Sequence, residues 1–306
     1  MTNAPSRRPL SRRDFLKMSG ISALSVGSLT ILTACGPSTA TTGDDSAEET
    51  NSSEASSFGS DGKLRVGMEV AYPPYNWQVS EPTDDTMPVD GLDGAYADGI
   101  DVYVSKHVAE AMGLEAVAVK LAWSGLIEAL NSGQIDCIIA GMTPTPDREE
   151  SIDFTDPYFV GYYGLLTRKD SPYANANCKE DLDGAAILGQ KDTLLDTAID
   201  EYDNVEHLTP VDSVPAQLSH LNEGACDCIT YNIENREGLL EANPDLVAID
   251  FDGDYRLFDI EASCNIGLKK GQEDIVDQMN GILDDMFADD EERDQIYQTI
   301  IARQPA

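Results

Sequence analysis

The chain has 306 residues, of which 41% are hydrophobic, and its 56 acidic and 20 basic side chains give a formal net charge of −36. This length and hydrophobic content suit one large globular domain or two modest ones. A surface this acidic repels phosphate backbones, which excludes nucleic acid as a partner.

The first residues have the order of an export signal. The segment "SRRDFLK" (Ser11–Lys17) precedes a mildly apolar stretch that ends in "LTAC" at Cys35. This order resembles a twin-arginine signal followed by a lipoprotein signal-peptidase box. The apolar stretch is too short and too polar for a convincing spanning helix, and the alternative is an uncleaved anchor helix with an incidental cysteine. We predict that residues 1–34 are a signal peptide and that lipidated Cys35 anchors the protein to the outer face of the cell membrane.

The segment after Cys35 lacks the residues that build a core. Residues 36–61 contain one phenylalanine and no other large apolar side chain. Such a segment buries too little surface to offset the entropy of ordering. We predict a disordered tether over 35–61.

Neither the cysteines nor the histidines have the spacing of a metal site. Besides Cys35 there are five cysteines, an odd number that cannot all pair within one chain. Cys226 and Cys228 are close in sequence, but no second cysteine or histidine pair accompanies them, and the three histidines are scattered. We therefore expect no metal and no cofactor.

The next part of the chain alternates between strand and helix periods. We expect strands at 63–70, 116–122 and 134–140, and helices at 99–113 and 123–133. In the second helix, Ser124 is the expected N-cap and Gly133 the expected C-terminal glycine. This β-α-β-α-β order is typical of a mainly parallel sheet covered by helices.

Two segments of the chain echo each other. "EALNSGQIDCII" (residues 128–139) matches "SHLNEGACDCIT" (residues 219–230) in the frame Leu-Asn-x-Gly-x-x-Asp-Cys-Ile. The repeat predicts two α/β lobes that use the same helix-turn-strand unit. It aligns Gly141 with Asn232, each at the end of a strand, where open α/β sheets bind ligands. We expect a cleft between the lobes at these strand ends.

Arg148 follows one of these strand ends, in "GMTPTPDR". Thr145 is suited to cap a helix whose first residue is Pro146. A helix N-terminus and the planar fork of an arginine together suit a carboxylate. The alternative is a surface ion pair with an acidic neighbour such as Glu149.

Residues from about 63 to 300 resemble the bacterial extracellular solute-binding family 3, the polar amino-acid-binding proteins of ABC importers. The matching pieces include "LRVGMEVAYPPYNW", "WSGLIEALNSGQIDCIIAGMTPTPDREESIDFTDPYF", "LDGAAILGQKDT" and "NIGLKKG". The resemblance implies a type II periplasmic-binding fold, with two α/β lobes and a central cleft. It assigns 62–160 plus 262–306 to one lobe and 163–258 to the other, with a two-segment hinge near 160–163 and 258–261.

The same resemblance implies roles for residues of the first lobe. Arg148 matches the arginine that grips the α-carboxylate of the ligand, and Thr143 matches a hydroxyl residue that assists it. Gly141 matches the residue whose carbonyl accepts from the α-amino group. Tyr72 and Trp123 match aromatic positions that sandwich the ligand side chain, although either could be an ordinary core residue.

Three further positions are implied near the ligand. Glu69 matches an acidic position at the distal end, where it would favour a cationic or amide-bearing side chain, and its alternative is a solvated strand-end charge. Gln190 and Thr193 fall in "GQKDT", which is similar to the carboxylate loop of the family.

Two residues near the expected ligand depart from the family pattern, as does Tyr103, whose position is structural. Asp192 stands where glycine is usual, and it puts an extra carboxylate near the carboxylate site. Asn232 stands where Asp or Glu usually pairs with the α-ammonium, and burying an ammonium without a counter-charge is costly. Either another carboxylate compensates (Glu69, Asp192 or Glu234), or the ligand is not a standard α-amino acid.

The function implied is capture without chemistry. The protein would bind a polar amino acid as a monomer and deliver it to an ABC permease, which with its ATPase forms separate chains. One alternative is an enzyme of the same fold that eliminates water from small carboxylic acids, with Glu69, Glu234 or His220 as candidate acids or bases. Another is a lipoprotein that presents its ligand to a sensor.

Overall fold

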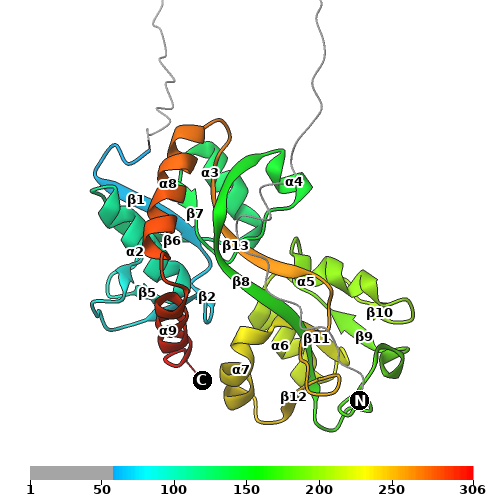
Figure 1. The fold of residues 1–306 in the computed structure, drawn as a ribbon. Coiled ribbons are helices and arrows are strands. Elements are labelled where there is room, and N and C mark those ends of the chain that lie inside the picture. The colour runs from blue at the N-terminus through cyan, green and yellow to red at the C-terminus, as the bar shows by residue number, and fades with distance from the viewer. Residues whose placement is uncertain (1–57, 306) are drawn as a thin grey trace, which may run out of the picture. The chain divides into compact units, whose positions relative to one another are not determined.

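The computed structural model describes residues 58–305 (Figure 1). The predicted signal peptide, Cys35 and most of the predicted tether lie outside these residues. The end of that tether is folded, since residues 58–61 form a turn and Phe58 packs against the first hydrophobic core. Phe58 is the one large apolar side chain of the segment, so the prediction of disorder up to residue 61 is wrong at this end. Between residues 58 and 305, no helix is both long and apolar enough to cross a membrane.

The larger sheet of the described region has nine strands. They are β1 (Lys63–Met68), β6 (Glu115–Lys120), β7 (Cys137–Ile138), β8 (Ile152–Arg168), β9 (Ala186–Leu188), β10 (Glu206–His207), β11 (Cys228–Asn232), β12 (Leu246–Ala248) and β13 (Glu261–Lys269). Their spatial order is β10-β9-β11-β8-β13-β7-β1-β6, with β12 paired to β8. β1 is parallel to β6 and β7, and β9 is parallel to β10 and β11. The predicted parallel pairing therefore holds at both ends, while β8 and β13 add antiparallel pairing in the middle.

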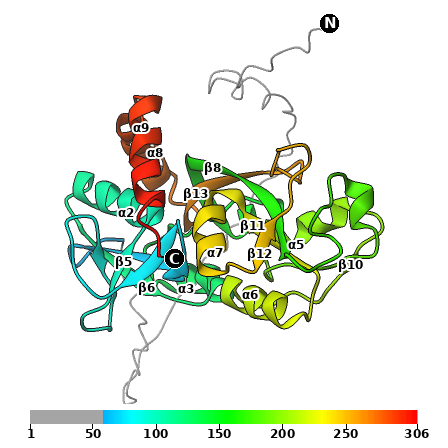
Figure 2. The same ribbon diagram turned by 90° about the horizontal axis from the view of Figure 1, so that it is seen from below.

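A second sheet and the helices complete the fold. The small antiparallel sheet contains β2 (Ala71–Tyr72), β3 (Asn76–Val79), β5 (Tyr96–Asp98) and β4 (Met87–Pro88). The α-helices are α2 (Ile100–Ala111), α3 (Leu126–Ser132), α4 (Pro146–Glu149), α5 (Leu194–Thr197), α6 (Val214–Glu223), α7 (Arg236–Ala242), α8 (Glu273–Met286) and α9 (Asp290–Ile301). The 3-10 turns are η1 (Trp123–Gly125), η2 (Lys179–Leu182), η3 (Ala198–Glu201) and η4 (Ile233–Asn235). Figure 2 shows α8 and α9 beside α2.

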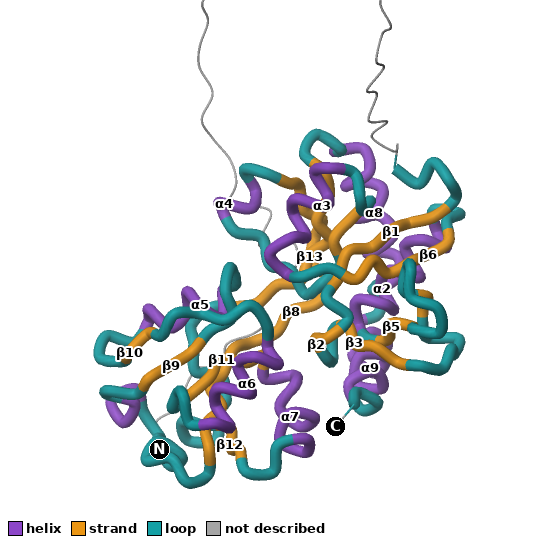
Figure 3. The backbone as a smooth tube through the Cα atoms, turned by 180° about the vertical axis from the view of Figure 1, so that it is seen from behind, coloured by secondary structure: helices purple, strands orange, loops and turns teal. Residues whose placement is uncertain are grey.

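Two lobes follow from where the hydrophobic cores lie. One core is built by β1 to β7 with α2, α3, α8 and α9, which together with α4 we call lobe 1. Two further cores lie among β9 to β12 and α5 to α7, which we call lobe 2. The long strands β8 and β13 pair with each other and run from one lobe into the other (Figures 1 and 3). The chain therefore crosses between the lobes twice, in adjacent strands.

The predicted repeat is confirmed as a structural one. Both copies run from a helix through a glycine with positive φ into a strand, α3 to β7 and α6 to β11; the glycines are Gly133 (φ 80°) and Gly224 (φ 74°). The Asp136 carboxylate accepts from the Arg65 N–H at 2.8 Å, and the Asp136 N–H donates to the Arg65 carbonyl at 2.9 Å. Asp227 makes the same two bonds with Ala186, at 2.9 and 2.8 Å. In each lobe the aspartate thus fixes the register of the neighbouring parallel strand.

One predicted cap is wrong. The helix expected over 123–133 begins with the 3-10 turn η1, and Gly125, without a side-chain cap, is the N-cap of α3. Ser124 lies inside η1, so its backbone is already helical and not in the extended conformation that an N-cap needs. The predicted end is correct, since Gly133 closes α3.

Candidate functional site

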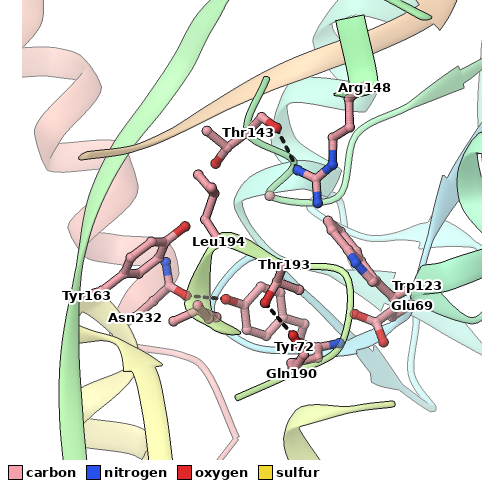
Figure 4. A pocket seen from close by; sticks show the side chains of 12 residues that line it. Glu69, Tyr72, Trp123, Thr143, Arg148, Tyr163, Gln190, Thr193, Leu194 and Asn232 are labelled. Atoms are coloured by element: carbon pink, nitrogen blue, oxygen red, sulfur yellow. Dashed lines mark hydrogen bonds between the residues drawn. The ribbon is translucent and has the colours of Figure 1, made fainter. Parts of the chain in front are cut away.

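A pocket lies between the lobes (Figure 4). All nine residues expected to bind a ligand line it: Glu69, Tyr72, Trp123, Gly141, Thr143, Arg148, Gln190, Thr193 and Asn232. Tyr163, Leu194 and Leu195, which the sequence did not single out, complete the lining. Glu69 follows β1, Gly141 follows β7 and Asn232 ends β11, so the pocket lies at carboxyl ends of strands from both lobes.

Arg148 is held in the pocket by its own loop and by lobe 2. Its N–H donates to the Thr145 hydroxyl at 3.3 Å, as expected for an N-cap. Its guanidinium donates to the Thr143 carbonyl at 2.6 Å and to the Asp192 carbonyl at 2.7 Å. The alternative, a surface ion pair between Arg148 and an acidic neighbour, is not found within residues 58–305, and Asp153, one such neighbour, pairs with Lys270 at 2.6 Å. Helix α4 has only four residues, so the guanidinium, and not a helix dipole, supplies the positive charge.

The two aromatic residues of lobe 1 are both tied to lobe 2. The Trp123 ring lies against the Arg148 guanidinium, 5.1 Å from it, and its Nε1–H donates to the Asp192 carbonyl at 3.0 Å. The Tyr72 hydroxyl donates to Oδ1 of Asn232. The Tyr72 ring stacks on Tyr75 with centroids 5.0 Å apart. Both side chains therefore make polar contacts at the lobe interface and are not merely core.

The backbone of Asp192 keeps the extra carboxylate out of the pocket lining, although its charge still raises the pKa of Arg148 against the effect of burial. Asp192 has φ 60°, the left-handed conformation that glycine adopts readily and aspartate tolerates. This conformation turns its carbonyl toward Arg148 and Trp123, while its side chain is exposed and does not line the pocket. Thr193 follows as the N-cap of α5, with its hydroxyl donating to the Gln190 carbonyl at 2.6 Å.

Glu69 is the one acidic residue among those that line the pocket. Burial raises the pKa of its carboxyl to about 7, against the opposing effect of a hydrogen bond from Gln190. Gln190 is itself buried and donates to the Asp212 carbonyl at 3.3 Å. The alternative of a fully solvated strand-end charge does not describe Glu69.

The side chain of Asn232 is hydrogen-bonded to two tyrosines. Besides accepting from Tyr72, it donates from Nδ2 to the Tyr75 hydroxyl at 3.1 Å. Glu234 lies nearby but outside the pocket lining, and its Oε1 accepts from the Tyr162 N–H of β8 at 3.1 Å. Burial raises the pKa of Glu234 to about 7. Glu234 thus binds the crossing strand through Oε1, while its Oε2 is buried with no hydrogen-bond partner among the described residues.

A buried network behind the pocket positions Gly141. The Asp101 carboxylate is fully buried and accepts from the Tyr158 hydroxyl at 2.6 Å and from Nδ2 of Asn76 at 2.8 Å. Burial raises its pKa to about 6 despite these bonds. The Gly141 N–H donates to the same tyrosine hydroxyl at 3.1 Å. The backbone at the end of β7 is therefore fixed from behind, a link that the sequence did not reveal.

The cysteines and histidines of the described region show no sign of a metal site. Over residues 58–305, no three His, Cys, Asp or Glu side chains gather in a way that could hold a metal. Cys137, Cys178, Cys226, Cys228 and Cys264 are free. His220 is exposed on α6 and lies outside the pocket lining, and Nδ1 of its ring lies 2.9 Å from the Ala216 carbonyl.

Two α/β lobes, joined by two adjacent strands around a polar pocket, define the class of two-lobed solute-binding proteins with the type II fold. The chain belongs to the bacterial extracellular solute-binding proteins, family 3, whose model matches residues 64–302. The family and the fold expected from the sequence are thereby confirmed.

Relatives of the chain bind different amino acids. It is 28% identical over 241 residues to a probable histidine-binding protein of Campylobacter jejuni. This alignment covers 78% of this chain and 84% of the relative. It is 26% identical over 233 residues to the L-cystine-binding protein TcyJ of Escherichia coli. That alignment covers 74% of this chain and 79% of TcyJ. A solved structure of the arginine-bound form of truncated ArgBP from T. maritima is similar with a TM-score of 0.62 at 26% identity, over 74% of this chain and 97% of that one.

Proposed function

We propose that the protein captures a polar amino acid between its lobes and delivers it to the permease of an ABC importer, which with its ATPase forms separate chains. The observation that carries the proposal is the guanidinium of Arg148 inside the pocket. A guanidinium has five N–H donors, and the protein uses two of them, so three remain for a ligand carboxylate. Relatives named for binding histidine, cystine and arginine support an amino acid as the ligand.

The predicted roles of the pocket residues belong to this proposal. Arg148 and Thr143 hold the α-carboxylate, and the Gly141 carbonyl accepts from the α-amino group. Tyr72 and Trp123 enclose the side chain. The remaining predicted ligand residues, which approach from other sides of the pocket, are Glu69, Gln190, Thr193 and Asn232.

Anchoring and closure are also proposals. We propose that Cys35 carries a lipid that holds the protein at the outer face of the membrane, after export through the twin-arginine signal. The lobes (62–160 plus 262–306, and 163–258) would rotate about the paired crossings of β8 and β13, where Gly161 pairs with Ala262. A ligand that contacts both lobes favours the closed state because it binds that state better.

Titration calorimetry of the purified chain with the common amino acids, and with matched acids that lack the amine, tests the proposal. We expect at least one amino acid to bind with a Kd near the micromolar range, about −8 kcal/mol. If no amino acid binds and only amine-free acids do, amino-acid capture is wrong.

A second candidate is an enzyme of this fold that removes water from a small carboxylic acid. The observation in its favour is Glu69, whose carboxyl has a pKa of about 7 inside the pocket, which suits proton transfer near neutral pH. Glu234 and His220 lie outside the pocket lining, which leaves Glu69 as the acid or base. Loss of water from hydroxy acids, followed by proton NMR, would favour this candidate if it disappeared in Glu69→Gln.

Binding should depend on pH through Glu69. A ligand cation beside Glu69 lowers its pKa below the free value of about 7, so the free protein holds more protons than the complex. Affinity is then highest above pH 7 and falls as the pH decreases, by up to about tenfold per pH unit. Glu69 is the one residue of the pocket lining whose pKa lies in this range, while Glu234 (about 7) and Asp101 (about 6) lie outside the lining. Calorimetry in buffers of different ionisation enthalpy should show that binding releases protons. Glu69→Gln should remove both the proton release and the pH dependence of the affinity. An affinity that rises in acid would mean that protonated Glu69 donates to the ligand.

A further inference from the structure

We infer that the pocket selects amino acids with no net charge, which carry one carboxylate and one cation, and discriminates against those with a second cation. This inference rests on the proposed function and names the class of ligand for the same site. It follows from the charges that line the pocket and from the carboxylates that do not reach it.

The pocket offers a ligand one positive and one negative side chain. Of the residues that line it, Arg148 is a cation and Glu69 is an acid. Tyr72 and Tyr163 are the other titratable residues of the lining, and burial raises the pKa of both, which keeps them neutral. A ligand with one carboxylate and one ammonium therefore matches the site charge for charge.

The expected ammonium site carries no charge of its own. Asn232 stands there, with Oδ1 accepting from Tyr72 and Nδ2 donating to Tyr75. A ligand ammonium beside Asn232 finds one remaining lone pair on Oδ1 and no counter-ion. Among the residues that line the pocket, Glu69 is therefore the one carboxylate available to a cation of the ligand.

The neighbouring carboxylates are held away from the ligand. Asp192 directs its carbonyl, and not its carboxylate, to the pocket side, and its side chain is exposed. Glu234 accepts from the Tyr162 N–H of β8 through one carboxylate oxygen, and its other oxygen is buried without a hydrogen-bond partner among the described residues. Asp101 is fully buried behind Gly141 and already accepts from Tyr158 and Asn76. None of the three lines the pocket.

An aromatic face attracts a cation more weakly than a carboxylate does, and one face of each aromatic ring of lobe 1 in the pocket is already covered. The Trp123 ring already lies against the Arg148 guanidinium, and one face of Tyr72 is covered by Tyr75. An amino acid with a cationic side chain brings two positive groups for one acid, so closure of the lobes would bury one of them unpaired. Burying an unpaired charge is strongly unfavourable.

Pairs of ligands that differ in charge but little in shape test the inference. L-arginine and L-citrulline, L-lysine and L-glutamine, and L-glutamate and L-glutamine are titrated into the full chain by calorimetry. We expect the neutral member of each pair that binds to have at least a tenfold lower Kd. A cationic member that binds as tightly as its neutral counterpart overturns the inference and leaves amino-acid capture intact. Failure of every amino acid to bind overturns both.

A variant places the specificity in one residue. Asn232→Asp adds a carboxylate that can still accept from Tyr72 and from the Tyr75 hydroxyl, so the fold is expected to remain. It should strengthen arginine or lysine binding at least tenfold relative to the neutral partner, whereas Glu69→Gln should weaken the binding of neutral amino acids. If the ratio of Kd for the cationic ligand to Kd for the neutral ligand is unchanged in a folded Asn232→Asp protein, the role given to Asn232 is contradicted. If the variant does not fold, the same ratios measured on the unaltered chain still decide the inference.

Discussion

Replacement of Arg148 by alanine is expected to weaken amino-acid binding by about 3 to 5 kcal/mol, a factor of roughly one hundred to several thousand. The guanidinium has three unused N–H donors in a pocket whose other charged residue is an acid. Without it, the ligand carboxylate would be removed from water with no cation beside it. Calorimetry with the tightest ligand of the panel measures the loss.

Two further variants serve as controls. One separates the planar donor geometry of Arg148 from its charge, and the other tests whether removal of any arginine weakens binding. Arg148→Lys keeps the charge but loses the planar pair of donors, so its loss should lie between those of the alanine variant and the unaltered chain. Arg293→Ala removes an arginine on α9 that pairs with Asp290 and Asp294, far along the chain and outside the pocket lining, and should leave the affinity unchanged. An Arg148→Ala protein that binds as well as the unaltered chain would contradict the carboxylate site.

The position of the site could be predicted because it depends on local patterns. The repeated helix-turn-strand unit places Gly141 and Asn232 at strand ends, and parallel strands bring such ends together at one edge of a sheet. Thr145, Pro146 and Arg148 are read from turn and capping preferences within a few residues. The resemblance to a family added roles that those patterns alone left open.

The partners of these residues could not be predicted because they come from distant parts of the chain. Tyr163 enters the pocket from β8, and Asp101 supports Gly141 through Tyr158, which lies 57 positions later. Such contacts depend on how distant strands are paired in register, which local patterns in the sequence do not reveal. The contact of Asp192 could not be predicted either. Its backbone φ decides whether its carbonyl or its carboxylate faces Arg148, and the sequence alone does not reveal that angle.

The floor of the pocket is tied to the start of helix α2. The Ile100 N–H donates to the Pro74 carbonyl at 3.1 Å, and the Asp101 N–H donates to the Tyr75 carbonyl at 2.9 Å. Tyr75 in turn stacks on Tyr72 and accepts from Asn232. The carbonyls of Pro74 and Tyr75 thus satisfy two free N–H groups at the start of α2. The same segment carries Tyr72 and Tyr75, the stacked pair next to the pocket.

Replacement of Gly99 by alanine should therefore strongly destabilise the protein. Gly99 has φ 134°, a conformation that side chains rarely adopt, and an added Cβ would lie 2.1 Å from the Tyr75 carbonyl oxygen. Because the atom it meets is backbone, either the start of α2 or the Tyr75 segment must move. We expect a loss of about 3 to 5 kcal/mol, which lowers the unfolding temperature by roughly 6 to 20 °C, and weaker ligand binding in the protein that remains folded.

The matched control for Gly99 is Gly281, an exposed glycine inside α8, where an added Cβ would meet no atom within 4 Å. Gly281→Ala should raise stability by about 0.5 to 1 kcal/mol, because alanine favours the helix and loses less entropy on folding. Thermal unfolding followed by circular dichroism should thus show the two glycine-to-alanine changes moving the transition in opposite directions. An unfolding temperature of Gly99→Ala equal to that of the unaltered chain would mean that α2 and Tyr75 do not approach as closely as the structure shows, and that the pocket floor does not depend on this contact.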